Sequence, residues 1–446
     1  MSPGTLFSPP CGPVRGWVDA GVIRATGIPY ATAERFAPPR PAAPWTAQFA
    51  ATSWAPACPQ GPVPFLDDVL GGSASELSFD ENCQHLSITI PGDLLPEESL
   101  PVMVWIHGGS YVSGAGDLPI MDPAALVAEQ RVIVVTVTYR LGLFGYLGGT
   151  TGRPANLGLL DQIEALRWVQ RNIAAFGGDP REVTAFGQSA GGDAVAHLMA
   201  TADASTLFRR AIIQSAPLGL SRGRARMNAT MASAAAGLSG DLSADEVVAR
   251  EPAIQALARS SGLKAGMPFG TQYGHAPLPP ESAIEGTWSR VAPEIDILIG
   301  HTSEEARLFI PRQPALARLT GLPVLGPLLR RLLVSTLTAA VYGRSNRRFA
   351  RRHARAAGRA DSYVISWAAP GNPFGSAHTI DLPLLFGEKE TWQRAALVAG
   401  ADWATLHAAA RRTRALWADF ARGVPLPTSG SVPGVLRHRA IGRRRL

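Results

Sequence analysis

A serine between small residues is the first feature of the sequence that could do covalent chemistry. Ser189 lies in residues 187–191 (GQSAG), which fit the pattern G-x-S-x-G. The apolar run 183–186 predicts a strand and residues 190–199 predict a helix, the context in which this pattern presents a nucleophile. Small neighbours allow a tight strand-to-helix turn, and the free amides at the helix start face a developing negative charge. The alternative is a turn of small residues with an ordinary surface serine.

A glycine-rich loop upstream of this serine could supply hydrogen-bond donors to the same reaction. Residues 107–110 (HGGS) directly follow the apolar run 102–106. Where a serine attacks a carbonyl group, a loop of this kind offers its backbone N–H groups to the oxyanion that forms. We expect the donors to be the amides of Gly108 and Gly109, together with that of Ala190 after the serine. A plain tight turn is the alternative.

A serine hydroxyl is a weak nucleophile near pH 7, so it needs a histidine base that a carboxylate orients. The chain order for this pattern is serine, acid, histidine, which excludes His85 and His107. His197 is too close to the serine, on the helix that follows it. His378 lies in a loop punctuated by glycine and proline (PFGSAHTIDLP), where such a base is usually placed. His407, in an alanine-rich helix, is interpreted as structural.

Two adjacent glutamates are the candidates for the orienting acid. The run 295–300 (IDILIG) predicts a strand, and Glu304 and Glu305 follow its end. The alternative is a solvated acidic turn at the start of a helix. The pattern alone does not choose between the two glutamates.

The elements that must position these residues alternate along the chain. Runs 102–106, 132–139 and 183–186 are rich in β-branched residues and poor in polar ones, which predicts strands buried on both faces of a mainly parallel sheet. Residues 161–174 carry an amphipathic stripe that a Gly-Gly-Asp-Pro segment ends. Strands alternating with helices predict a doubly wound α/β sheet.

Almost all of the positive charge of the chain comes from arginine. Lys and Arg number 42 against 35 Asp and Glu, and Lys264 and Lys389 are the only lysines. A pI of about 9.7 suits nucleic acid or an anionic membrane surface as a partner. No nucleic-acid-binding motif of the usual kinds is present, so we expect no nucleic-acid partner and interpret the arginines as lying on a solvated face. With 46% hydrophobic and 17% charged residues, the composition excludes a disordered chain.

The sequence predicts one domain, 1–446, with helical insertions. Residues 220–265 and 311–360 predict cap or insert helices, and 437–446 predict a loose basic tail. The basic helix 344–355 could contact a membrane surface, but we favour the solvated face of a cap helix. The apolar tract 322–342 is interrupted by Pro, Gly and Arg, so we expect no stable membrane insertion.

Targeting, cysteine and metal signals are sparse. Residues 1–13 lack the basic and apolar regions of a signal peptide, so a cytoplasmic location is expected, without excluding export by another route. Three cysteines do not form a disulfide scaffold, and no CxxC or Cys/His cluster predicts a metal site.

Several longer motifs resemble the type-B carboxylesterase (cholinesterase-like) family of α/β-hydrolases, in particular its bacterial para-nitrobenzyl-esterase-like members. The resemblance covers nearly the whole chain and is weaker over the segments 220–265 and 311–360. The motifs are 27–31 (GIPYA), 156–162 (NLGLLDQ), 176–180 (FGGDP), 208–215 (FRRAIIQS) and 417–421 (WADFA).

The resemblance implies an α/β-hydrolase fold and assigns the remaining site residues. Residues 300–309 (GHTSEEARLF) match the family's acid pattern G-x-x-x-D-E-G-x-x-F, which selects Glu305, and the family's histidine motif selects His378. The resemblance also pairs Cys58 with Cys83 in a disulfide, and Cys11 lies outside this pattern. Gln188 stands where the family often has glutamate, which argues against cationic esters.

The function that this resemblance implies is carboxylic-ester hydrolysis. Ser189, Glu305 and His378 would act through an acyl-enzyme on small neutral esters, with no metal or organic cofactor. The partner is then a small-molecule ester, and the sequence leaves the oligomeric state open. The alternatives are a catalytically inactive binding module of the same fold, or a hydrolase of thioesters, amides or lactones.

Overall fold

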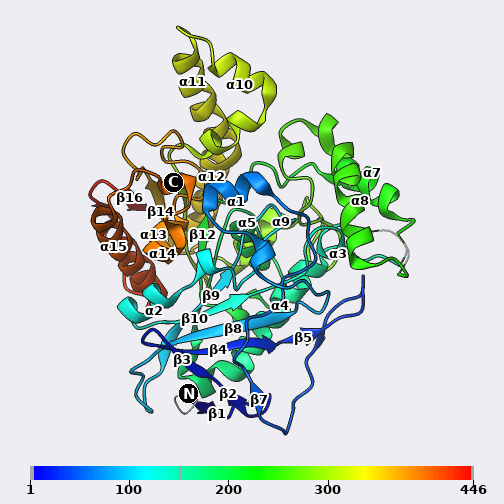
Figure 1. The fold of residues 1–446 in the computed structure, drawn as a ribbon, viewed down its shortest axis with the longest axis vertical. Coiled ribbons are helices and arrows are strands. Elements are labelled where there is room, and N and C mark those ends of the chain that lie inside the picture. The colour runs from blue at the N-terminus through cyan, green and yellow to red at the C-terminus, as the bar shows by residue number, and fades with distance from the viewer. Residues whose placement is uncertain (1–4, 150–151, 239, 443–446) are drawn as a thin grey trace.

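The computed structural model describes residues 5–149, 152–238 and 240–442. Within these residues, a mixed sheet of 11 strands forms the centre of the fold (Figure 1). From one edge to the other the strands are β15 (Ser429–Val432), β16 (Leu436–Ala440), β14 (Ala360–Ile365), β13 (Asp296–Thr302), β12 (Arg210–Gln214), β11 (Gly178–Gln188), β9 (Leu100–Ile106), β10 (Ile133–Val137), β8 (His85–Pro91), β4 (Val22–Pro29) and β3 (Trp17–Asp19). The strands from β14 to β10 are parallel, and antiparallel strands flank them on both sides. The prediction of a mainly parallel sheet is confirmed.

The register of the parallel strands brings their carboxyl ends to one edge of the sheet. Ile106 at the end of β9 pairs with Gly187 near the end of β11. Gln188 pairs with Gln214 on β12, which in turn pairs with Gly300 on β13. The loops that follow β9, β11 and β13 are therefore neighbours in space, although they are far apart in sequence.

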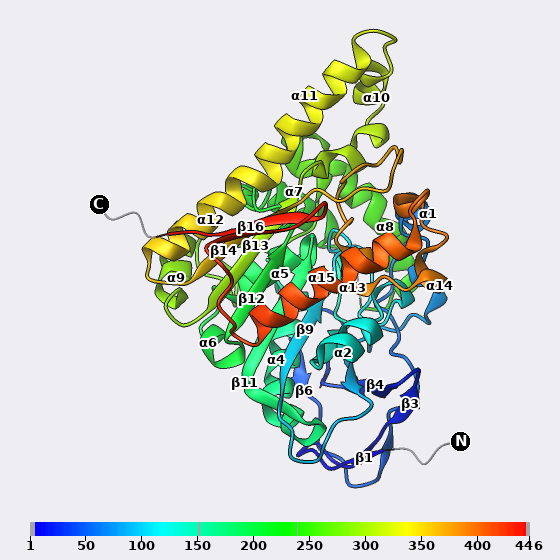
Figure 2. The same cartoon turned by 90° about the vertical axis from the view of Figure 1, so that its left-hand side faces the viewer.

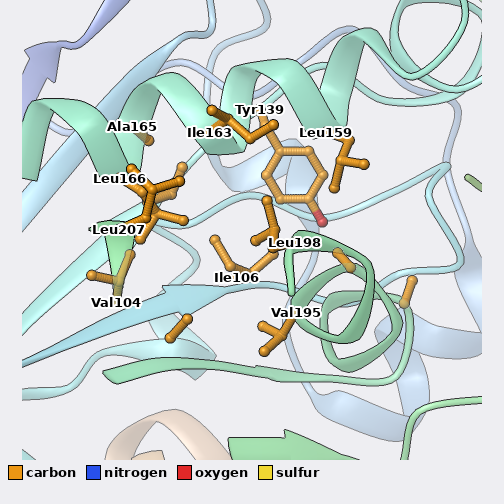
Figure 3. Packing of buried hydrophobic residues seen from close by; sticks show 14 of the residues in the cluster. Val104, Ile106, Tyr139, Leu159, Ile163, Ala165, Leu166, Val195, Leu198 and Leu207 are labelled. Atoms are coloured by element: carbon orange, nitrogen blue, oxygen red, sulfur yellow. The ribbon is translucent and has the colours of Figure 1, made fainter. Parts of the chain in front are cut away.

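Helices cover both faces of the sheet because both faces are apolar. Along β9, Val104 and Ile106 belong to one buried cluster, whereas Met103 and Trp105 belong to the other. The first face is covered by α4 (Leu157–Asn172), α5 (Ala190–Leu198), α9 (Ile284–Val291) and α12 (Arg344–Arg355). The second face is covered by α2 (Ala124–Gln130), α13 (Leu382–Phe386) and α15 (Trp403–Ala421). Figure 3 shows α4 and α5 packing their aliphatic side chains against Val104 and Ile106.

The predicted inserted segments contain several helices outside these two layers. Residues 220–265 hold α7 (Ala225–Ala235), α8 (Ala244–Ala256) and most of the 3-10 segment η4 (Leu257–Gly266). Residues 311–360 hold α10 (Pro314–Thr320), α11 (Gly326–Thr338), the π-helical turn η7 (Ala339–Gly343) and α12. In Figure 2, α11 and α12 follow one another as one long rod, and the α10–α11 end projects beyond the body.

The remaining elements are short. They are β1 (Leu6–Phe7), β2 (Val14–Arg15), β5 (Ala31–Thr32), β6 (Arg40–Pro41), β7 (Phe49–Ala50), α1 (Pro64–Leu70), η1 (Ala74–Glu76), η2 (Pro119–Met121), α3 (Gly142–Gly145), η3 (Ile173–Phe176), α6 (Ala204–Leu207), η5 (Glu305–Leu308), η6 (Ile310–Arg312), α14 (Lys389–Trp392) and η8 (Ala396–Val398). In the described part of the chain, no helix is long and apolar enough to cross a membrane.

The prediction of a loose tail from residue 437 is wrong at its beginning. Residues 437–440 belong to β16, which pairs with β14 and β15. The segment alternates, with Leu436 and His438 buried and Arg437 and Arg439 exposed, which is the period of a half-buried strand. Residues 443–446 of the predicted tail lie outside the described residues, as do residues 1–4.

Candidate active site

Ser189 lies on the sharp turn between β11 and α5, at φ 59° and ψ −124°. Residues other than glycine rarely adopt a positive φ, and such strain is concentrated at functional sites. The turn fits because its neighbours lack side chains: a Cβ on Gly191 would lie 2.0 Å from the carbonyl oxygen of Ile106, and one on Gly187 would lie 2.6 Å from it. The amide of Ser189 donates to the carbonyl of Gln214 at 2.9 Å. The nucleophile turn is thus held against two neighbouring strands.

His378 is the histidine that reaches this serine. Its Nε2 lies 2.8 Å from the Ser189 hydroxyl oxygen, and its Nδ1 lies 2.5 Å from Oε2 of Glu305. An Nδ1 proton donated to the carboxylate leaves Nε2 as an acceptor for the serine hydroxyl proton. The three side chains that the sequence analysis selected therefore form one continuous hydrogen-bonded chain.

Glu305 is buried and held from two sides. Its Oε1 accepts a hydrogen bond from the amide of Thr302 at 2.7 Å, while Oε2 faces His378. Burial acts to raise the pKa of the Glu305 carboxyl, but the neighbouring His378, through its charge and its hydrogen bond, lowers that pKa below its ordinary value. The group is therefore an ionised carboxylate that can orient the imidazole.

The Glu304 carboxylate bonds to the backbone of the loop that carries His378, and not to the imidazole ring. Its carboxylate accepts from the Arg307 guanidinium at 2.9 Å and from the amide of Ser376 at 3.0 Å. Its own amide donates to the Ser376 carbonyl. Glu305 is therefore the glutamate that contacts His378, whereas Glu304 contacts the backbone of the same loop.

The loop after β9 lies directly beside the nucleophile turn. A Cβ on Gly108 would lie 3.2 Å from the Cβ of Ser189, and Gly109 has a φ of 114°, which favours glycine. Within the described residues, no group accepts a hydrogen bond from the amides of Gly108, Gly109 or Ala190. These three donors are free to serve a group bound at the serine.

His107 supports this loop from behind. It is fully buried, its ring stacks on Tyr139 at 4.3 Å, and its Nδ1 lies 2.8 Å from the Gly108 carbonyl oxygen. Burial lowers the pKa of the His107 imidazole to about 4, so the ring is neutral near pH 7. Its position agrees with its exclusion as the catalytic base.

Two residues that sequence reasoning did not assign, Phe309 and Tyr342, lie near His378 together with Gln188, for which it predicted a role in substrate charge. The rings of Phe309 and Tyr342 each lie 5.3 Å from the imidazole, and Nε2 of Gln188 lies 3.5 Å from its Nε2. Phe309 closes the family's acid pattern, so a signal for it existed. Tyr342 comes from the π-helical turn η7, and no local motif marks it.

A second unassigned group is a buried polar network on α5. Asp193 accepts hydrogen bonds from the Tyr111 hydroxyl at 2.7 Å and from the Ser221 hydroxyl at 2.5 Å. Burial acts to raise the Asp193 pKa, but the neighbouring His197 outweighs it and the pKa is lowered. The network connects the glycine loop, through Tyr111, to the helix that starts at Ser189.

The cysteine pairing implied by the family resemblance is absent. Cys58 and Cys83 are both buried free thiols, as is Cys11. The amide of Leu141 donates to Sγ of Cys58 at 3.2 Å. Burial, with a hydrogen bond to Cys58, raises the Cys83 pKa well above its ordinary value, so this sulfur is held as a protonated thiol.

No cluster of three or more His, Cys, Asp or Glu that could hold a metal ion occurs among the described residues.

Comparison with known proteins identifies the family. Residues 7–319 match the family model described as the carboxylesterase family. The chain belongs to the carboxylesterase family. A family relative from Rhodococcus erythropolis, "Probable N-octanoylanthranilate hydrolase AqdA2", is 37% identical over 417 residues, with 92% of this chain and 91% of the relative covered. The para-nitrobenzyl esterase of Bacillus subtilis (strain 168) is 35% identical over 422 residues, covering 86% of this chain and 83% of that one.

Solved carboxylesterase structures agree with the sequence relatives. A thermophilic pNB esterase superposes with a TM-score of 0.77 at 30% identity, covering 94% of this chain and 91% of its own. This likeness confirms the α/β-hydrolase fold. The protein is a carboxylic-ester hydrolase, as the resemblance in the sequence predicted.

Proposed function

We propose that ester hydrolysis proceeds through Ser189, His378 and Glu305. The observation that carries this proposal is the unbroken chain from the Glu305 carboxylate through both ring nitrogens of His378 to the serine hydroxyl, at 2.5 Å and 2.8 Å. His378 takes the serine proton as Oγ attacks the ester carbonyl carbon, and then gives that proton to the leaving alcohol. Water attacks the acyl-enzyme with His378 again as base, and serine and carboxylic acid are released. Glu305 orients the ring and stabilises the imidazolium.

The amides of Gly108, Gly109 and Ala190 are proposed as the oxyanion hole. Their lack of acceptors among the described residues and the closeness of Gly108 to Ser189 support this assignment. Donors held in advance stabilise the oxyanion without reorganisation, and removal of one such donor costs about 10²- to 10³-fold in rate.

Small neutral esters are the proposed substrates. Gln188, directly before the nucleophile, brings a neutral amide to 3.5 Å from the His378 ring. A carboxylate at this position would help to hold a cationic substrate, and the amide offers no such attraction. The rings of Phe309 and Tyr342, each 5.3 Å from the imidazole of His378, provide apolar surface beside the base, which favours uncharged groups.

Amide hydrolysis is the second candidate, since the relative from Rhodococcus erythropolis is named for an N-octanoyl compound. The same serine, base and oxyanion donors would serve an amide if His378 protonates the leaving nitrogen. An inactive binding module is disfavoured because all three side chains of the triad are present and connected.

Within a single domain 1–446, the segments 220–265 and 311–360 are proposed as cap segments. The cytoplasmic location and the absence of a nucleic-acid partner stay predictions.

A fluorophosphonate probe and a panel of chromogenic substrates test the catalytic proposal. The wild-type protein should be labelled and should hydrolyse p-nitrophenyl acetate and butyrate, and Ser189→Ala should do neither. Labelling of Ser189→Ala would move the nucleophile elsewhere. Matched p-nitroanilides separate the two candidate functions, because faster turnover of the anilides than of the esters would favour the amide hydrolase.

A further inference from the structure

The positive charge of the chain is concentrated in one segment. Residues 306–360 contain twelve arginines and neither aspartate nor glutamate. The other 391 residues hold 30 Lys and Arg against 35 Asp and Glu, so they are net negative. This segment includes α10 and the rod that α11, η7 and α12 form (Figure 2).

The projecting end of the rod exposes apolar side chains. Val324 is 86% exposed, Leu328 is 67% exposed and Leu332 is 61% exposed. Leu319, Leu322 and Leu325 beside them are also more than two-fifths exposed. Contiguous exposed apolar groups mark a contact surface, whereas single ones need no explanation. Arg318 on α10 and Arg330 and Arg331 on α11 are exposed on the same two helices.

The other end of the rod carries an arginine surface. On α12, five arginines are exposed: Arg344, Arg347, Arg348, Arg351 and Arg355. They line a groove of about 610 Å³ together with Arg352 and Glu285. Glu285 already pairs with Arg222 and Arg352, at 3.0 Å and 3.4 Å. In the described part of the chain, no carboxylate pairs with any of the five.

Strand β16 extends the arginine surface. Arg437 and Arg439 line a second groove of about 680 Å³, and Arg439 joins Arg351 and Arg355 around a third of about 260 Å³. Neither Arg437 nor Arg439 pairs with a carboxylate of the described residues. The three hollows share residues, so they form one continuous surface, on which Glu285 is the one carboxylate among the described lining residues.

The apolar tip and the arginine surface lie on the same side of the rod. An α-helix turns about 100° per residue, and the π-helical turn takes up about one extra residue. With that shift, Leu328 and Leu332 on α11 align with Arg351 and Arg355 on α12, opposite the buried Phe349. In Figure 2 the two helices run along one border of the molecule, with β16 beside α12.

We propose that this border docks on the surface of an anionic lipid bilayer. The leucines and Val324 would enter the boundary between headgroups and acyl chains, and the arginines would bind the lipid phosphates. Nucleic acid would use the arginines but leaves the leucines without a role. A symmetric second copy would bring two positively charged segments together, which opposes self-association through this face. The docking does not depend on the proposed catalytic residues.

Flotation of the full-length protein with vesicles tests this proposal. One set contains phosphatidylglycerol and phosphatidylcholine in equal parts, and the other contains phosphatidylcholine alone. Wild type should float with the anionic vesicles about tenfold or more better than with the neutral ones, and about 0.5 M NaCl should weaken the binding. Leu328→Ser/Leu332→Ser and Arg348→Gln/Arg351→Gln should each weaken it about tenfold or more.

Matched controls and alternative outcomes keep the test decisive. Leu95→Ser, at a 55% exposed leucine between β8 and β9, and Arg226→Gln, at an exposed arginine of α7, should bind as wild type does. All four variants should hydrolyse p-nitrophenyl acetate normally without vesicles, which separates this proposal from the catalytic one.

Three results would overturn the docking proposal. The first is no binding of wild type to the anionic vesicles. The second is loss of binding in the arginine variant alone, with competition by duplex DNA, which indicates a polyanion site. The third is a dimer, seen by sedimentation velocity, that the leucine variant converts to a monomer while vesicles have no effect.

Discussion

Glu304 and Glu305 are adjacent in the chain, yet their carboxylates contact different parts of the loop that carries His378. Oε2 of Glu305 lies 2.5 Å from Nδ1 of His378, whereas Oε2 of Glu304 accepts from the amide of Ser376 at 3.0 Å. One glutamate orients the imidazole and the other fixes the backbone just before it. A change at either position therefore has a distinct consequence.

Glu305→Gln should lower kcat for p-nitrophenyl butyrate by about 10³- to 10⁴-fold, because the amide no longer stabilises the imidazolium and its NH₂ group favours the wrong tautomer. KM should change little. Glu304→Gln should keep kcat within about tenfold, and should instead lower the free energy of unfolding by about 1–2 kcal/mol through its weakened bonds to Arg307 and Ser376. Steady-state kinetics and urea denaturation of both variants check this pair. A larger kcat loss in Glu304→Gln would reverse the assignment.

Gln188→Glu should shift substrate preference toward cationic esters. A carboxylate near His378 adds an attraction of about 1 kcal/mol to a positive charge bound near it, or about fivefold in kcat/KM. The measured quantity is the ratio of kcat/KM for a choline ester to that for a neutral ester of the same acid. Gln188→Met, which removes the amide without adding charge, should leave this ratio unchanged. An equal ratio in all three proteins would mean that this position does not face the substrate.

Gly191→Ala should disrupt both stability and activity. Its Cβ would lie 2.0 Å from the Ile106 carbonyl oxygen, a backbone atom that cannot move without shifting β9. We expect a loss of about 3 kcal/mol or more in the free energy of unfolding. Gly286→Ala is the matched control, because no atom lies within 4 Å of the added Cβ on helix α9. That variant should gain about 0.5–1 kcal/mol, since alanine favours the helix. Similar stabilities of the two variants in guanidinium denaturation would contradict this prediction.

Glu251→Gln should stabilise the protein from about pH 5 upward, with a gain that grows until about pH 7. The carboxylate joins α8 to α3 by accepting from the amide of Leu143 at 2.7 Å, and burial raises the pKa of Glu251 from 4.5 to about 7. Between these values the folded state holds a proton that the unfolded state has lost, so stability falls as the pH rises. Glutamine carries no charge there, so the variant should be more stable by about 2–3 kcal/mol at pH 8 and unchanged at pH 4. An exposed control, Glu97→Gln, should differ little from wild type at either pH.

The sequence predicted the parts of the site that local patterns encode. The β-branched runs identified β9, β10 and β11, and small residues around Ser189 identified the nucleophile turn. The choice of Glu305 needed the family pattern, because two adjacent glutamates are equivalent until the backbone places their side chains. In the structure, Glu305 is the glutamate whose carboxylate contacts His378.

Long-range contacts account for what the sequence did not predict. Tyr342 reaches His378 only because a π-helical turn ends α11 beside the histidine loop, and Asp193 meets Tyr111 only because α5 packs next to the loop after β9. Neither contact has a spacing in sequence that marks it. The strand at Arg437 was missed because the buried position between its two arginines is a histidine, so the segment lacks an apolar face, and because its partner β14 lies far upstream.

The backbone of Ser189 implies a trade between activity and stability. Its φ of 59° with ψ of −124° is unfavourable for any residue with a Cβ, and the strain is of the order of 1–3 kcal/mol. Ser189→Gly and Ser189→Ala both lose the hydroxyl, but only glycine relaxes the backbone. We therefore expect the glycine variant to be more stable than the alanine variant by about 1 kcal/mol, as thermal denaturation of the two would measure. In that case the difference between the two variants would measure how much stability the fold loses by holding a side chain at this turn.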